Sequence, residues 1–341
     1  MPRIVPIIDL NQFERDPNTR QAFLNDLRSA ARDVGFFYLT GHDIPNEQID
    51  DLFAEARRFF ALPLDEKLKI EMINSPQFRG YTRVGGERTR GLADWREQLD
   101  FGVERDTIPQ DAGAPAWTRL QGPNLWPDAL PELRNAILDW QQKTTATAIR
   151  LLRAFAAALE QPEDIFSPIY GTSPNHRMKI VKYPGRDSTQ DDQGVGAHKD
   201  GGFLTLLLQD EQKGLQVEYN GAWVDVEPIP GTLVVNIGEL LELASNGYLR
   251  ATVHRVVTPP AGVTRYSVPF FFSAQLDSEI PLLELPEHLA AEALGPESDP
   301  ENPLLRNVGE NILKSRLRSH PDVAARYYSD LGEQGRQQAA E

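Results

Sequence analysis

Arg177-Met178-Lys179-Ile180-Val181-Lys182-Tyr183 opens a series of short runs that are rich in apolar and β-branched residues. A residue pattern with a period of two is typical of β-strands, because successive side chains point to opposite faces. Six further runs follow, most of them separated by glycine, proline or asparagine, at residues 203–208, 215–218, 223–226, 232–237, 251–257 and 265–271. So many short strands within about 100 residues predict an antiparallel double-sheet barrel or jelly roll rather than a βαβ fold.

The chain before these runs is predicted to be largely helical. Apolar residues recur at helical spacing after residue 22, after Pro45 and from Pro131 to just before Gln161. Short strands are expected at 4–10 and 36–39. We therefore expect a mainly β protein with flanking helices, built as one structural unit. Its three parts are a mixed helical region at 1–170, which includes a loop-rich connector at 74–128, a β-core at 171–280 and a helical segment at 281–341.

The composition excludes several classes of site and partner. The 341 residues include no cysteine and six histidines, so a metal must be held by His, Asp or Glu. With 35 basic and 50 acidic residues the net charge is −15, which argues against binding to nucleic acid or to acidic membranes. No run approaches the roughly 20 apolar residues of a membrane-spanning helix, and no apolar segment of the secretory type follows Arg3. A cytoplasmic location is expected.

Two histidines and one aspartate form a candidate metal site within the β-rich stretch. His198 and Asp200 are two residues apart, and on a strand the side chains of residues i and i+2 lie on the same face. His254 lies in another strand-like run, from which a neighbouring strand would complete the ligand set. Two imidazoles and one carboxylate leave coordination positions open, an arrangement associated with non-haem Fe(II) oxygenases. We predict that these three residues bind iron and form the catalytic centre.

Arg265 and Ser267 form a second candidate site with the same i, i+2 spacing. Arginine binds a carboxylate through two parallel hydrogen bonds, and a buried guanidinium without such a partner is costly. An incoming dicarboxylate would provide the partner, and the phenol of Tyr183 would add a third hydrogen bond.

The motifs of these two sites resemble those of one family, the isopenicillin N synthase-like Fe(II)/2-oxoglutarate-dependent dioxygenases. Further segments that carry the resemblance are Lys182-Tyr183-Pro184, Gly238-Glu239, Ser245-Asn246-Gly247, Val5-Pro6-Ile7-Ile8-Asp9 and Gly309-Glu310-Asn311-Ile312-Leu313-Lys314. The resemblance covers nearly the whole chain, from an amino-terminal region of the non-haem dioxygenase type to the carboxy-terminal segment.

The resemblance implies a distorted double-stranded β-helix that holds Fe(II) on His198, Asp200 and His254. It also implies 2-oxoglutarate and O2 as co-substrates and ascorbate as a reductant, with Arg265, Ser267 and Tyr183 around the far carboxylate of 2-oxoglutarate. The expected reaction converts 2-oxoglutarate to succinate and CO2 while a small-molecule substrate is hydroxylated, desaturated or cyclised. A monomer or homodimer is expected.

Two other functions stay open at this point. Isopenicillin N synthase uses an equivalent Arg-x-Ser pair for the carboxylate of its own substrate and needs no 2-oxoglutarate, so an Fe(II) oxidase or cyclase of that type is the alternative. A catalytically silent β-barrel binding protein is the third hypothesis, and the intact set of His198, Asp200 and His254 argues against it. Val181 also stands where plant members of the family often carry an asparagine that contacts the co-substrate.

An arginine-rich segment indicates where the main substrate binds. Residues 79–96 hold five arginines against only two acidic residues. In the family this connector borders the mouth of the active site, so the resemblance implies that Arg79 and Arg83 capture a carboxylate or another anion. Tyr81 and Phe101 would be apolar contacts of the same substrate. A solvated loop is the alternative, because runs of charge usually lie on the surface.

The other four histidines are not expected to bind metal. His42 follows a strand at a turn and is predicted to be structural, and nothing near His176 in the sequence completes a ligand set. His288 and His320 lie among charged residues of helical segments, which is typical of a solvated surface.

Overall fold

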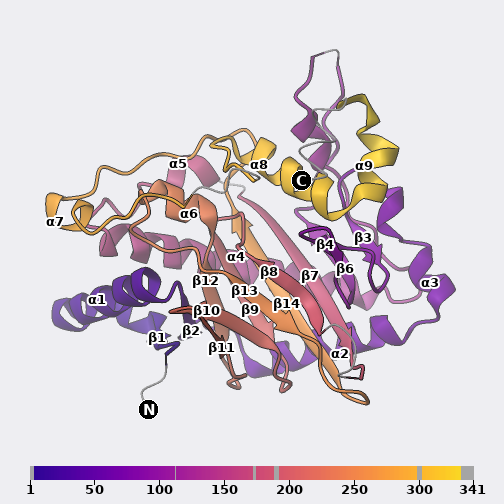
Figure 1. Ribbon diagram of the computed structural model, residues 1–341, viewed down its shortest axis with the longest axis horizontal. Coiled ribbons are helices and arrows are strands. Elements are labelled where there is room, and N and C mark those ends of the chain that lie inside the picture. The colour runs from indigo at the N-terminus through magenta and orange to yellow at the C-terminus, as the bar shows by residue number, and fades with distance from the viewer. Residues whose placement is uncertain (1–3, 112, 172–173, 188–191, 298–301, 332–341) are drawn as a thin grey trace.

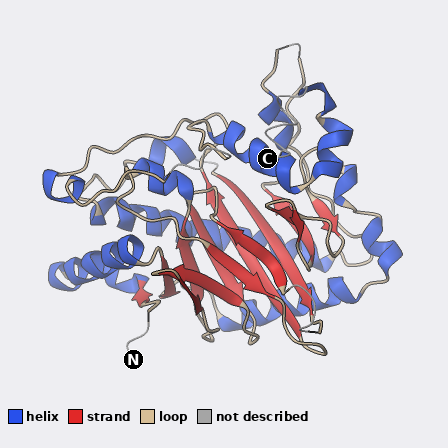
Figure 2. Cartoon of the chain, in the orientation of Figure 1, coloured by secondary structure: helices blue, strands red, loops and turns tan. Residues whose placement is uncertain are grey.

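Two β-sheets fill the middle of the molecule and helices surround them (Figure 1, Figure 2). The computed structural model describes residues 4–111, 113–171, 174–187, 192–297 and 302–331. The larger sheet contains, in spatial order, β1 (Ile7–Asp9), β2 (Phe36–Thr40), β12 (Leu233–Ile237), β9 (Leu204–Gln209), β14 (Thr264–Ser273), β7 (Asn175–Pro184), β6 (Glu97–Gly102) and β3 (Gly80–Thr82). The smaller sheet contains β11 (Ala222–Asp225), β10 (Leu215–Tyr219), β13 (His254–Val257) and β8 (Gln193–His198). The predicted double-sheet fold is confirmed.

Helices form the outer layer of the fold. They are α1 (Pro17–Asp33), α2 (Asn46–Ala61), α3 (Leu64–Leu68), α4 (Glu132–Ala158), α5 (Ser167–Tyr170), α6 (Glu239–Ala244), α7 (Glu287–Ala290), α8 (Val308–Ser319) and α9 (Pro321–Tyr327). Short 3-10 turns are η1 (Leu10–Glu14), η2 (Met72–Asn74), η3 (Ala116–Leu120) and η4 (Ser329–Leu331). Among these described helices, none has both the length and the apolar character that a bilayer crossing requires.

The alternation of side chains divides the core of the larger sheet into two faces. On β14, Val268, Phe270 and Phe272 belong to the apolar cluster on the helical side, where α4 packs against β9 and β14. The opposite face looks toward the smaller sheet, and there Val234 joins a second apolar cluster with Val217. Full burial of each such side chain contributes about 1.5–3 kcal/mol. Polar side chains between the sheets are therefore enclosed by apolar layers.

The longest helix supports the back of the larger sheet. It is α4, which begins one residue after Pro131 and packs against α1 and α2. Trp140 and Phe155 on its inner face are buried. The helical periodicity predicted from Pro131 to Gln161 is confirmed, as are the helices after residue 22 and after Pro45.

Parts of the sheets lie outside the predicted elements. The connector at 74–128 contributes β3 and β6 to the larger sheet, and β4 (Arg88–Thr89) and β5 (Leu92–Ala93) pair with each other. A strand was expected at His198, but residues 193–197 of β8 were not among the predicted runs, because the sequence Gln-Gly-Val-Gly-Ala-His contains two glycines, which weaken the strand pattern. In the predicted carboxy-terminal segment 281–341, α7, α8 and α9 are present, while 298–301 and 332–341 lie outside the described residues.

Four connector residues that were expected to contact the substrate have partners within the fold. Arg79 is buried and donates hydrogen bonds to the carbonyl oxygens of Val103 and Gly122, each at 2.8 Å. Phe101 is buried and stacks on Trp126, with ring centroids 5.0 Å apart. The Arg79 guanidinium thus ties the loops that follow β6 to the start of β3.

Tyr81 and Arg83, the other two connector residues, also have partners within the fold. The hydroxyl of buried Tyr81 donates to Glu97 at 2.7 Å, and burial, together with this carboxylate, raises the pKa of the phenol. Arg83 lies on the surface and pairs with Glu71 at 2.6 Å.

Replacing Arg79 should therefore destabilise the protein. We expect Arg79→Met to lower the free energy of unfolding by about 2–4 kcal/mol, because several buried acceptors lose their donor. Urea denaturation of both proteins measures the difference. Arg83→Met is the matched control and should change stability by no more than about 0.5 kcal/mol, since its ion pair is exposed. Equal stability of Arg79→Met and Arg83→Met would contradict this structural role.

Candidate metal centre and active site

A cavity of about 880 Å³ opens between the two sheets. The inward side chains of β7 and β14 form one wall, and His198, Val195, His254 and Val256 of the smaller sheet form the opposite wall. Residues around β4 and residues of α8 complete the rim.

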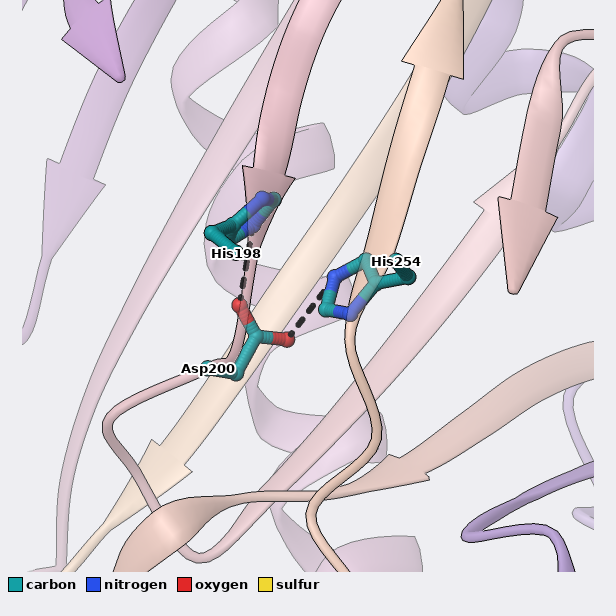
Figure 3. Close-up of side chains that lie close together, drawn as sticks. All are labelled: His198, Asp200 and His254. Atoms are coloured by element: carbon teal, nitrogen blue, oxygen red, sulfur yellow. Dashed lines mark ion pairs between the residues drawn. The ribbon is translucent and has the colours of Figure 1, made fainter. Parts of the chain in front are cut away.

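His198, Asp200 and His254 come together at one point of this cavity (Figure 3). Each offers a ligand atom, and these atoms all lie within 4.8 Å of one another. Nε2 of His198 is 3.5 Å from Oδ1 of Asp200, and Nε2 of His254 is 3.8 Å from Oδ2. The two imidazole rings are 4.3 Å apart between centroids. The convergence that the sequence predicts is present in the structure.

The local structure at these residues differs from the expected single strand. His198 is the last residue of β8 and His254 is the first residue of β13, and the two are directly paired across the strands. Asp200 lies beyond the end of β8, in the loop that leads to β9. The prediction that His198 and Asp200 share a face of one strand is thus wrong. The loop turns the carboxylate back toward the imidazoles.

Backbone carbonyls set the orientation of both imidazoles. Nδ1 of His198 is 2.8 Å from the carbonyl oxygen of Gly196, and Nδ1 of His254 is 3.1 Å from that of Thr252. A carbonyl can only accept, so each Nδ1 carries the proton and each Nε2 presents a lone pair to the centre. Phe36 packs edge-on against His254, with ring centroids 5.2 Å apart.

Two neighbouring strands hold the carboxylate of Asp200. Thr205 of β9 donates its hydroxyl to Oδ2 at 2.6 Å, and Asn236 of β12 donates its amide to the same oxygen at 2.8 Å. These bonds occupy Oδ2 and turn Oδ1 toward His198. No sequence signal indicated either donor, because both are ordinary strand residues outside the motif.

The loop of Asp200 is also held by its backbone. The amide of Glu239, at the start of α6, donates to the carbonyl oxygen of Asp200 at 2.8 Å, and the amide of Leu240 donates to that of Gly202 at 3.1 Å. Gly238 is required here, because a Cβ at this position would lie 2.1 Å from the carbonyl oxygen of Gly202. The Gly238-Glu239 segment therefore positions the loop without entering the metal site.

The ionised state of Asp200 and the neutral state of His254 suit a bound cation. Burial, and then the nearby His198, lower the pKa of His254 to about 4, so this imidazole is neutral. Burial works against ionisation of Asp200, but His254 and His198 outweigh it and hold the pKa of that carboxyl far below its usual range. Burial likewise opposes a charge on His198, yet the adjacent Asp200 raises its pKa overall. One carboxylate and two imidazole Nε2 atoms face a common point, the donor set of a divalent transition metal, and a bound metal would replace any proton on Nε2 of His198.

A guanidinium lies elsewhere in the same cavity with unused donors. Arg265 is 0% exposed, and its Nη2 donates to Oε1 of Gln209 at 2.8 Å. Its Nε and Nη1 are buried without a hydrogen-bond partner among the described residues. A buried guanidinium in this state is costly, and a carboxylate would supply the acceptors that its unused donors lack. Gln209, which the sequence did not indicate, orients the group.

Tyr183 and Ser267 line the same cavity as Arg265. Cζ of Arg265 is 4.9 Å from the centroid of the Tyr183 ring, and these two residues are paired across β7 and β14. Ser267 is buried, also lines the cavity and pairs with Val181 on β7.

The arginine-rich connector reaches the cavity through a different set of residues. Arg88, Arg90 and Arg96 line it, whereas Arg79, Tyr81, Arg83 and Phe101 are not among its lining residues. The predicted placement of those four residues at the mouth is therefore wrong. The sequence also missed Arg177 and Lys179, which enter the cavity from β7 because they share its inward face with Tyr183.

The remaining histidines do not join the metal site. His42 is buried, and its ring nitrogens bond to the carbonyl oxygen of Gly231 and the amide of Ile44, as a structural role requires. His288 is exposed and pairs with Glu160. The prediction of a solvated His320 is wrong, because this residue is 1% exposed and lies 3.3 Å from Glu87.

Two family models match the chain. The non-haem dioxygenase in morphine synthesis N-terminal model matches residues 5–129, and the 2OG-Fe(II) oxygenase superfamily model matches residues 174–274. The second match contains His198, Asp200, His254, Arg265 and Ser267.

Known proteins resemble the chain over most of its length. A 2-oxoglutarate-dependent dioxygenase, frbJ, of Dothideomycetidae sp. is 37% identical over 340 residues, which cover 95% of this chain and 91% of the relative. Homoarginine-6-hydroxylase 2-ODD-C23.1 of Arabidopsis thaliana is 34% identical over 295 residues, which cover 82% of this chain and 88% of the relative. Among solved structures, a full-length Neurospora crassa protein in complex with alpha-KG and thymine has a TM-score of 0.74 at 25% identity, with coverage of 95% and 97%. A 2OG-Fe(II) oxygenase family protein from Caulobacter crescentus has a TM-score of 0.73 at 30% identity, with coverage of 92% and 98%.

These similarities decide between the functions that the sequence left open. Two relatives that match the chain over more than 90% of its length are named 2-oxoglutarate-dependent dioxygenases, and the Neurospora crassa structure holds alpha-KG, so an oxidase that does not use 2-oxoglutarate is not favoured, and neither is a silent binding protein. The chain therefore belongs to the 2OG-Fe(II) oxygenase superfamily and is an Fe(II)- and 2-oxoglutarate-dependent dioxygenase.

Proposed function

We propose that this dioxygenase oxidises an anionic small-molecule substrate, with Fe(II) on His198, Asp200 and His254 and with 2-oxoglutarate on Arg265, Ser267 and Tyr183. The observation that carries the proposal is the presence, in one cavity, of three converging ligand atoms and a buried guanidinium with unused donors. When bound, Fe(II) activates O2 and couples the decarboxylation of 2-oxoglutarate to oxidation of the substrate.

The protein holds the metal through a fixed set of donors. The Nε2 atoms of His198 and His254 and Oδ1 of Asp200 would bind one face of the ion, since carbonyls and the donors on Oδ2 occupy their other polar atoms. Three protein ligands leave positions for 2-oxoglutarate and O2. Fixed donors need little rearrangement when the ion arrives.

The protein holds 2-oxoglutarate at its far carboxylate. Nη2 of Arg265, which keeps one N–H beside its bond to Gln209, would donate together with Nε or with Nη1 to the two carboxylate oxygens, and the hydroxyl of Ser267 would add a third hydrogen bond. The Tyr183 ring lies under the guanidinium and keeps its plane in place. Val181 pairs with Ser267 and its side chain has no polar group, so the asparagine contact of plant relatives is absent from this position.

The charge of the cavity supports an anionic main substrate. Its lining contains nine arginines and lysines against four aspartates and glutamates, and three carboxylates behind the lining, Asp94, Asp100 and Glu242, pair with lining cations, which leaves an excess of two positive charges in a chain of net charge −15. Of the charged lining residues, Asp200 would bind the metal and Arg265 would bind 2-oxoglutarate. The remaining excess would attract and hold a second anion. Hydroxylation, desaturation and cyclisation stay alternatives, and the cytoplasmic location and the monomeric or dimeric state stay predictions.

Loss of the metal ligand should abolish the reaction without unfolding the protein. We expect Asp200→Ala to show no 2-oxoglutarate-dependent succinate release with Fe(II) and O2, because the anionic member of the ligand set is gone. Chromatographic measurement of succinate tests this, and circular dichroism checks the fold. Asp225→Ala, on the exposed strand β11, is the control and should keep the wild-type rate. Succinate release by Asp200→Ala would contradict the ligand assignment.

Loss of the guanidinium should weaken 2-oxoglutarate binding. Hydrogen bonds to charged groups contribute about 1.5–3 kcal/mol, so Arg265→Leu should raise the Kd of 2-oxoglutarate at least about 10-fold. Anaerobic titration follows the visible charge-transfer band of the Fe(II) complex. Arg255→Leu, which removes a guanidinium stacked on Trp223 in the smaller sheet, should leave the Kd unchanged. A wild-type protein without any band would instead restore the oxidase alternative.

The donors to Asp200 should affect metal affinity. Thr205→Val keeps the shape of the side chain but removes the hydrogen bond to Oδ2, and we expect Mn(II) to bind about 10–100-fold more weakly. Isothermal titration calorimetry measures this affinity. Thr232→Val removes a hydroxyl that bonds to the carbonyl of Ile229, away from the metal ligands, and should bind Mn(II) as the wild type does. Equal affinity of the two variants would show that Thr205 does not position the carboxylate.

A further inference from the structure

Arg177 is a cation of the cavity for which the described part of the chain provides no polar partner. It lies on β7 and lines the cavity, and its Nη1 is buried without a hydrogen bond. Among the described residues it makes no hydrogen bond or ion pair, and its one ring contact is with Phe271, whose centroid is 5.4 Å from Cζ. Burial, and then the like charge of Arg316, lower the pKa of Arg177 to about 9. A bound anion would therefore stabilise the charged guanidinium of Arg177 and accept its unused hydrogen bonds.

The charged residues next to Arg177 are already balanced. Lys179 binds Glu87 at 2.6 Å and lies 3.5 Å from Asp100, and Arg316 of α8 lies 3.4 Å from Asp100. Arg96 binds Glu87 at 2.8 Å and Asp94 at 3.2 Å. Three cations thus share three carboxylates: Arg96, Lys179 and Arg316 with Glu87, Asp94 and Asp100. Arg177 is an additional positive charge beside this cluster.

The strand register places Arg177 close to the metal ligands. Arg177 pairs with Phe271, Phe271 pairs with Thr205, and Thr205 pairs with Asn236. Paired residues point to the same face, so this row of side chains contains both donors to Asp200. Two strand spacings separate the Cα atoms of Arg177 and Thr205, a distance of about 10 Å. The long arginine side chain can therefore hold a ligand beside the metal centre.

The same register separates Arg177 from the proposed 2-oxoglutarate site. Arg265 pairs with Tyr183 at the other end of the strand pair, six residues along β14 from Phe271. Six residues of strand span about 20 Å, which is longer than a five-carbon dicarboxylate. One molecule of 2-oxoglutarate cannot reach both guanidiniums, so Arg177 is available to a different anion.

We propose that Arg177 binds a carboxylate of the main substrate and so directs a nearby carbon of that substrate toward His198, Asp200 and His254. This inference rests on the proposed function, because it takes 2-oxoglutarate to occupy Arg265. It narrows the main substrate to carboxylic acids and names the residue that selects them.

The test compares acids with their amides on the full chain loaded with Mn(II) and 2-oxoglutarate. Acetate, benzoate and phenylacetate are each paired with the corresponding amide at constant ionic strength, and the thermal midpoint is recorded. We expect at least one acid to raise the wild-type midpoint by about 2 °C or more beyond its amide. This difference should vanish in Arg177→Met and persist in part in Arg177→Lys. Arg83→Met, whose ion pair lies on the surface, should retain it.

A second readout separates binding from a structural role. Without any acid, Arg177→Met should unfold at a higher temperature than the wild type, because an apolar chain replaces an unpaired buried charge. A lower midpoint would show that Arg177 stabilises the fold and would overturn the proposal. An acid preference that survives in Arg177→Met, or no preference in the wild type, would also overturn it.

The proposed function is checked separately in the same preparation. Calorimetric binding of 2-oxoglutarate to the Mn(II)-loaded wild type shows whether the co-substrate site is sound. If 2-oxoglutarate binds while the acids show no dependence on Arg177, only the inference about the main substrate fails. If 2-oxoglutarate does not bind, the proposed co-substrate site at Arg265 is wrong. The assignment of 2-oxoglutarate to Arg265 and of a different anion to Arg177 then fails as well.

Discussion

The pairing of β7 with β14 is the constraint on which the site depends. Its register places Arg265 beside Tyr183, and six residues farther along β14 it places Phe271 beside Arg177. The alternating residues of the same strands, such as Val268 and Phe270, fill the apolar core on the helical side. A slip of one residue would exchange the two faces, so charged groups would enter the core and apolar groups would line the cavity. The large cost of burying unpaired charge therefore enforces both the fold and the chemistry of the cavity.

Charge balance explains how the cavity tolerates so many ionised groups. The cluster of Lys179, Arg96 and Arg316 with three carboxylates is neutral as a set, and removal of one partner from such a buried pair typically costs about 3–5 kcal/mol. Because Arg316 belongs to α8, the cluster also fastens the carboxy-terminal helix to β6 and β7. The segment that forms the rim of the cavity is thus tied to its wall by the same ion pairs that neutralise the wall.

The elements and residues that follow from local or repeated patterns could be predicted from the sequence. Those that depend on packing between distant segments could not. A period of two predicted seven strands, and helical spacing predicted α1, α2 and α4, because alternation and apolar stripes are local properties. The convergence of His198, Asp200 and His254 was predicted from residue type and spacing. Most of β8 was not predicted as a strand because its two glycines weaken the strand pattern, although this strand carries His198. The roles of Thr205 and Asn236 as donors to Asp200, and of Gln209 as an acceptor for Arg265, were not predicted, because these contacts form only when the strands pair. Arg79 and His320 were misjudged because a charged or titratable residue in a polar segment resembles a surface residue until its partners are known.

The cations of the cavity differ in what the fold provides for them. Arg96, Lys179 and Arg316 each contact carboxylates of the chain, which is the usual state of a buried structural charge. Arg265 has the neutral amide oxygen of Gln209, and Arg177 has no polar partner among the described residues. A fold that leaves donors unpaired gives up stability, and a ligand that pairs with them returns it as binding free energy. Arg265 and Arg177 lie at opposite ends of the β7–β14 pair, and the converging metal ligands lie beside the row that contains Arg177. An enzyme that brings 2-oxoglutarate and the proposed carboxylate substrate to one metal would require this distribution of unpaired charge.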